Sequence, residues 1–206
     1  MNHPPHEAGF LLAQQLIQAG ILEELSPEKI RHLAPQGAIL ITCGDRDRIT
    51  GHLSGCQRIV DIHLIALNGG AILLGEGVDE KRKHTIIEEC HDAMYLKEIH
   101  FIFSLSHFPC GKGDLLGMSL QQNILANLQG KDVLKASFLS IGIKVRVLPI
   151  VSIDWRESGL ANEDGVRLYG TKRNKVHAIK HFDPAKHVAH RKPHLSSSPY
   201  SSLNTL

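Results

Sequence analysis

The sequence predicts an α/β fold with a mainly parallel central sheet in three layers. Short apolar runs rich in strand-forming residues alternate along the chain with stretches whose apolar residues recur at helical spacing. The apolar runs are continuous, which is typical of strands that are buried on both faces, as in a parallel sheet. A strand that follows the last of these helices is expected at an edge of the sheet. The 206 residues are enough for one domain with a substantial core.

The N-terminal part predicts two helices and a strand. Residues 8–22 carry apolar side chains at helical spacing. Ser26-Pro27-Glu28 has the pattern of a helix start, with a capping serine, a proline in the first turn and an early acid. The run over residues 37–42 predicts a strand that ends directly at Cys43.

The middle of the chain predicts two more strands, each followed by a helix. Residues 62–67 form one apolar run, closed by Asn68-Gly69-Gly70, and residues 99–105 form another, closed by Ser106-His107. The helix after each strand is indicated by apolar residues on one face: Ile86, Ile87, Cys90, Ala93 and Met94 in the first, and Leu120, Ile124, Leu125 and Leu128 in the second.

The C-terminal part predicts a half-buried strand and a short return strand. Apolar and polar residues alternate over 143–155, and Pro149 favours an edge position or a bulge, because proline has no N–H to donate. A turn then leads into residues 166–169. Beyond residue 170 the pattern ends, so we expect one domain over 1–170 and a basic tail, rich in His and Ser and disordered, over 171–206.

The net charge of +2 is unevenly distributed along the chain. Residues 171–206 contain seven Lys or Arg and one Asp, a net charge of +6, which leaves −4 for residues 1–170. A fold that binds nucleic acid usually carries the positive charge itself, so we do not expect a nucleic-acid partner. No apolar run approaches the roughly 20 residues of a membrane span, and the start has no basic segment of a signal peptide, so we expect a cytoplasmic protein without a membrane partner.

Two cysteines and a histidine follow strands that are predicted to be parallel. Cys43 ends one strand, and His107 and Cys110 end another, so their side chains are expected at the same edge of the sheet. Two thiolates and an imidazole are ligands that Zn²⁺ prefers. Asp45 would take the fourth position or accept a hydrogen bond from a zinc-bound water. Such a water has its pKa lowered towards about 7, which predicts hydration or hydrolysis chemistry.

A structural interpretation of the same residues stays open. Cys43 and Cys110 would then be small buried side chains, and His107 a hydrogen-bonded histidine in a turn. Cys90, on the apolar face of a helix, is expected in the core, and Cys56 has no partner at metal-binding spacing.

Cys43-x-Asp45, followed by His107-x-x-Cys110-Gly111, resembles the zinc motif of the β-class carbonic anhydrases. The resemblance covers residues 35–155 in the order of elements, and Asn68-Gly69-Gly70-Ala71 is similar to the glycine-containing turn of that family. It implies a homodimeric, zinc-dependent lyase, in which zinc-bound hydroxide adds to carbon dioxide, yielding bicarbonate, or to a similar small electrophile. The metal ligands would be Cys43, His107 and Cys110, with Asp45 orienting the water.

The chain departs from the family pattern next to Asp45. The family has an Arg two residues after this Asp, which clamps it, whereas this chain has Asp47 there, flanked by Arg46 and Arg48. Either Arg46 or Arg48 would be the clamp, and Arg46 is favoured because it is adjacent to Asp45. If Asp45 is unclamped, it would bind the zinc itself, which predicts a non-catalytic zinc module whose basic tail recruits a partner.

Overall fold

The computed structural model describes residues 6–44, 62–158, 165–171 and 176–183. In this part of the chain, the strands form one six-stranded sheet in the order β1-β6-β5-β4-β2-β3. The strands are β1 (Leu22–Glu24), β2 (Ala38–Thr42), β3 (Ile62–Ala66), β4 (Phe101–Phe108), β5 (Arg146–Asp154) and β6 (Val166–Thr171). β3, β2, β4 and β5 are parallel to one another, while β6 and β1 are antiparallel to their neighbours. The predicted α/β class with a mainly parallel sheet is confirmed.

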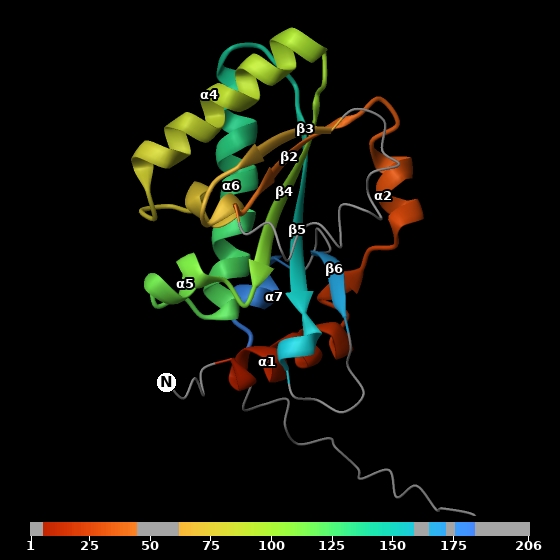
Figure 1. The fold of residues 1–206 in the computed structure, drawn as a ribbon, viewed down its shortest axis with the longest axis vertical. Helices are drawn as coiled ribbons and strands as arrows, with labels where there is room; N and C mark the ends of the chain where they lie inside the picture. The colour runs from red at the N-terminus through yellow and green to blue at the C-terminus, as the bar shows by residue number, and fades with distance from the viewer. Residues whose placement is uncertain (1–5, 45–61, 159–164, 172–175, 184–206) are drawn as a thin grey trace, which may run out of the picture.

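Helices cover both faces of this sheet (Figure 1). The helices are α1 (Glu7–Gln18), α2 (Pro27–Leu33), α4 (Glu80–Lys97), α5 (Gly111–Leu115), α6 (Leu120–Ser140) and α7 (Val176–Lys180), with short 3-10 helices η1 (Gly70–Leu74) and η2 (Trp155–Glu157). Core clusters place α1, α4, α6 and α7 on one face and α2 on the other. Within the described ranges, no helix has the length and apolar character that a membrane crossing requires.

Two helix starts follow directly from the sequence. Ser26 accepts a hydrogen bond from the main-chain N–H of Lys29, with Pro27 in the first turn, as predicted. At the start of α6, Ser119 and Gln122 form a reciprocal capping box. This cap fixes where α6 begins and therefore which of its residues face the sheet.

The expected edge position of the strand around Pro149 is wrong. β5 lies inside the sheet, paired with β4 on one side and β6 on the other. Pro149 is opposite Ser104 of β4, and the pairing with β6 begins only at Ile150. At Pro149 the strand therefore has a single neighbour, which is why the missing N–H is tolerated inside the sheet.

The edge strand on this side is β1, which the sequence pattern did not indicate. The helix expected over 8–22 ends at Gln18, and Gly20 adopts a positive φ of 63°. This left-handed glycine turns the chain so that Leu22–Glu24 pairs with β6.

Part of the segment that we expected to be tail packs against the core. α7 lies beyond residue 170, and Ile179 and Phe182 are buried in the same cluster as α1 and α6. The side chain of Gln121 donates a hydrogen bond to the main-chain O of Ile179 at 2.6 Å. The folded unit therefore extends at least to Phe182, and residues 184–206 lie outside the described part.

Candidate metal centre

Cys43, His107 and Cys110 meet at the carboxyl edge of the sheet. Cys43 directly follows β2, His107 is the penultimate residue of neighbouring β4, and Cys110 caps the N-terminus of α5. Their ligand atoms all lie within 4.8 Å of one another. The side chains are buried, with exposed fractions of 5%, 4% and 2%. Two parallel strands that are adjacent in the sheet thus bring together residues that are 64 positions apart in the chain.

The donor set fits a Zn²⁺ ion. Two sulfurs and one imidazole match the ligands of tetrahedral zinc sites. Neither ring nitrogen of His107 has a hydrogen-bond partner among the described residues, although both are buried. An unsatisfied buried polar group costs about 1–3 kcal/mol, and coordination of one nitrogen to a metal would relieve part of that cost.

The turn after β3 is built around Cys43. Gly69, at a φ of 105°, donates its main-chain N–H to Sγ of Cys43 at 3.2 Å. A Cβ on Gly70, at a φ of 52°, would lie 2.4 Å from the main-chain N of Cys43 and 2.5 Å from the carbonyl C of Thr42. Only glycine allows this approach, so the Asn68-Gly69-Gly70 turn is a tight βα turn that also supplies an N–H to the sulfur.

The two thiols influence each other directly. A hydrogen bond with Cys43 raises the pKa of the Cys110 thiol above its ordinary value, and burial raises it further. The main-chain N–H groups of Gly113 and Lys112 act in the opposite direction. Since a metal binds the thiolate form, a cation at this position would compete with protons for the sulfurs.

Two further polar side chains next to the cluster have buried atoms without a partner in the described part of the chain. They are Oγ1 of Thr42, the residue before Cys43, and Oδ1 of Asn123 on α6. The amide of Asn123 donates to the main-chain O of His107 at 3.2 Å. Neither residue was predicted from the sequence. For Asn123 there was a signal, because an asparagine between Leu120 and Ile124 lies close to the apolar face of a predicted helix.

Several predicted site residues lie outside the described part of the chain. They are Asp45, Arg46 and the alternative clamp Arg48, and Asp47 and Cys56 lie outside it as well. Asp45 as a ligand or orienting residue, and Arg46 as its clamp, therefore remain predictions. Cys90 is fully buried on α4, as expected for a core residue.

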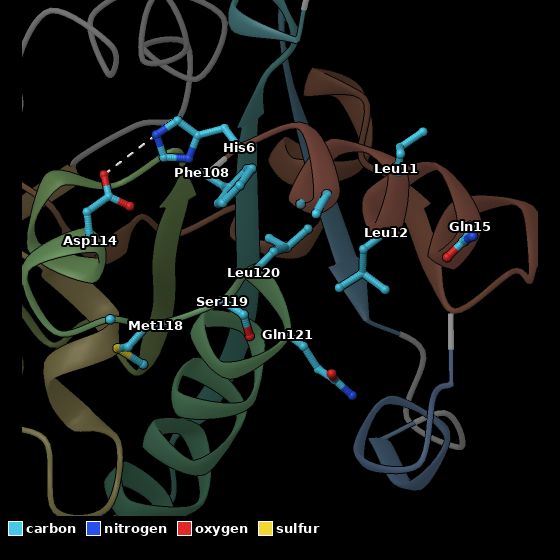
Figure 2. Close-up of a pocket in the computed structure, with 13 residues that line it drawn as sticks. His6, Leu11, Leu12, Gln15, Phe108, Asp114, Met118, Ser119, Leu120 and Gln121 are labelled. Carbon is cyan, nitrogen blue, oxygen red and sulfur yellow. Dashed lines mark ion pairs between the residues drawn. The ribbon is translucent and has the colours of Figure 1, made fainter. Parts of the chain in front are cut away.

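A groove of about 850 Å³ lies between α1 and the turn that joins α5 to α6 (Figure 2). Its walls are largely apolar and include Phe108 and Met118. Nε2 of His6 lies 3.7 Å from a carboxylate oxygen of Asp114 at its rim. Met118 also packs against the cluster that contains Cys43 and Cys110. The groove therefore adjoins the cysteine side of the candidate centre.

Comparison with known proteins finds similarity among solved structures alone. No protein-family model matches the chain, and neither does any curated protein. The chain is similar to the β-carbonic anhydrase CafD of the filamentous fungus Aspergillus fumigatus. One mutant of CafD is 15% identical, with a TM-score of 0.47, over 73% of this chain and 98% of that one. A second mutant is 13% identical, with a TM-score of 0.43, and the wild type is 14% identical, with a TM-score of 0.41. Each of these two matches covers 73% of this chain and 99% of the other. These structures represent the family that the Cys43-x-Asp45 and His107-x-x-Cys110 motifs resemble.

Proposed function

We propose that the chain holds Zn²⁺ through Cys43, His107 and Cys110 and hydrates carbon dioxide or a similar small neutral electrophile. The observation that carries the proposal is the convergence of two sulfurs and a buried, otherwise unpartnered imidazole within 4.8 Å. Zn²⁺ bound by such ligands supplies Lewis acidity, which makes hydroxide available near neutral pH.

The residues around the centre have separate tasks in this proposal. Cys43 and Cys110 bind as thiolates, and the N–H of Gly69 stabilises the negative charge on Cys43 through its hydrogen bond. His107 binds as the neutral imidazole. Asp45 accepts a hydrogen bond from the attacking water and so orients it, and Arg46 holds the carboxylate of Asp45 in place.

The assembly and the location belong to the same proposal. Leu11 lines the groove, and Leu115 and Leu116, which end α5, are also exposed apolar side chains, with Leu115 exposed to 85%. Exposed apolar side chains favour an interface, here between two copies of the chain, which sedimentation equilibrium would test. Thiols that bind a metal must stay reduced, which favours the cytoplasm.

Carbon dioxide hydration should be measured by stopped flow on protein whose zinc content is determined on the same sample. We expect one zinc per chain and hydration that Asp45→Ala abolishes without loss of zinc. Hydration by a zinc-free sample, or unchanged hydration by Asp45→Ala, would contradict the proposed roles.

A second function is favoured by the deep burial of all three ligand residues. Structural zinc sites are closed by a fourth protein ligand, and Asp45 would be that ligand here. The chain would then be a non-catalytic zinc module that recruits a partner through its basic C-terminal segment. Full zinc content without hydration across neutral and alkaline pH would select this function over the first.

A further inference from the structure

Asn123 lies on α6, beside the segment that carries His107 and Cys110. It is 2% exposed, and its Nδ2 donates to the main-chain O of His107 at 3.2 Å. Nδ2 also lies close to Gly113 in α5, because a Cβ built on this glycine would lie 3.8 Å from Nδ2 and 3.5 Å from Cβ of Cys110. The amide of Asn123 is therefore in position to fix the main chain between two of the three ligand residues.

The other end of the same amide has no partner. Oδ1 of Asn123 is buried, and nothing in the described part of the chain donates a hydrogen bond to it. Both nitrogens of His107 and Oγ1 of Thr42 are in the same state. Buried polar atoms in folded proteins are nearly always hydrogen-bonded, so an unpartnered Oδ1 on the residue that holds the His107 main chain indicates a donor that binds there.

We infer that Asn123 is a positioning residue for the metal centre. Through Nδ2 it holds the His107 main chain, and through Oδ1 it accepts a hydrogen bond from a donor that is present only in the loaded site. Groups that orient metal ligands in this way typically change metal affinity 10- to 100-fold when they are removed. The inference rests on the proposed zinc binding and goes beyond it, because it assigns a role to a residue outside the ligand set.

The test is the zinc affinity of the full chain and the Co²⁺ spectrum of the cobalt-substituted protein. Asn123→Leu keeps the approximate size of the side chain and removes both polar atoms. We expect zinc affinity to fall about 10- to 100-fold. We also expect altered intensity in the d–d bands of Co²⁺, which report the ligand geometry. Asn123→Ala serves as the second variant if Asn123→Leu does not fold.

Asn127, one turn further along α6, is the matched control. Its amide bonds to Ser104, Ser106 and Ile150, none of which is a proposed metal ligand. Asn127→Leu should lower the melting temperature of the zinc-free chain more than Asn123→Leu does, yet leave zinc affinity and the Co²⁺ spectrum unchanged. Wild-type affinity in both Asn123 variants, or equal loss of affinity in Asn127→Leu, would overturn the inference. Wild-type chain that binds no zinc would overturn the proposed function and, with it, this role.

Discussion

Asn127 and Asn123 lie one turn apart on the same buried face of α6, and their surroundings differ sharply. Asn127 is fully bonded: its Nδ2 donates to the main-chain O of Ser104 and of Ile150, each at 2.9 Å, and its Oδ1 accepts from Oγ of Ser104 at 2.6 Å. Asn123 makes one hydrogen bond and leaves its Oδ1 without a partner among the described residues.

The two asparagines separate a part of the molecule whose buried polar groups are hydrogen-bonded from a part in which several are not. Around Asn127, the chain satisfies its own buried polar groups and joins α6 to β4 and β5. Around Asn123, the ligand residues and their neighbours leave several polar atoms unsatisfied. Because unsatisfied buried groups are costly, those near His107 fit the proposed metal centre, while the saturated network around Asn127 fits a structural role.

The strongest test of this comparison removes a proposed metal ligand from the part around Asn123. Cys110→Ala should abolish stoichiometric zinc binding, because two protein ligands do not hold zinc tightly. Zinc content by atomic absorption after gel filtration is the measurement. Cys90→Ala, which removes a buried thiol that is not part of this cluster, should keep one zinc per chain. Full zinc in Cys110→Ala would show that Cys110 is not a ligand.

The turn that supports Cys43 can be broken at Gly70. Gly70→Ala should destabilise the chain by about 3 kcal/mol, because a Cβ there meets the main chain of Thr42 and Cys43 in addition to the cost of the left-handed conformation. Zinc affinity should fall as well. Gly77→Ala is the matched control, with a φ of 70° and open space around its Cβ, and should cost only about 1 kcal/mol. Urea unfolding measures both, and equal losses would show that the turn does not pack tightly on Cys43.

The saturated network is tested by Asn127→Leu. It leaves the main-chain O of Ser104 and of Ile150 without their partner, so we expect the free energy of unfolding to fall by about 2 kcal/mol. In the zinc-free chain, Asn123→Leu should lower the free energy of unfolding by less than Asn127→Leu does, since it removes a single hydrogen bond. Urea unfolding of both zinc-free variants provides the comparison. If Asn123→Leu is the more damaging of the two, the contrast between the asparagines fails.

The thiol of Cys90 has an expected effect on stability that appears only at alkaline pH. Burial raises the pKa of this thiol from 9.0 to about 12. Below pH 9 the thiol is protonated in both states, and between pH 9 and 12 the unfolded chain loses the proton first. The folded state should therefore lose about 1.4 kcal/mol of stability per pH unit over this range.

The effect of Cys90 is isolated by comparing the wild type with Cys90→Ala. Other groups also titrate between pH 9 and 12, but they are common to the two chains. The difference in their unfolding free energies, measured by urea at pH 8, 9, 10 and 11, should shrink as the pH rises. A constant difference would mean that the thiol of Cys90 is not protected by burial.

Much of the fold was predictable from local patterns. The apolar runs that became β2, β3 and β4, and the apolar faces that became α4 and α6, are strong signals because burial requires them at fixed spacing. The start of α2 was equally clear from Ser26 and Pro27. β1 and the interior position of β5 were not predictable, since both depend on pairing with β6, which is far away in the chain from β1.

The sequence by itself determined the chemistry that the chain can offer: two thiols and an imidazole placed where parallel strands end, and a glycine turn between them. Only the tertiary structure decided that Cys43 and Cys110 face each other with His107, and that Asn123 on α6 reaches the His107 main chain. The physical reason is that the local pattern of the chain shows which residues follow the end of a strand. The distance between side chains depends on which strands become neighbours, and here β2 and β4 are adjacent although β3 separates them in the sequence.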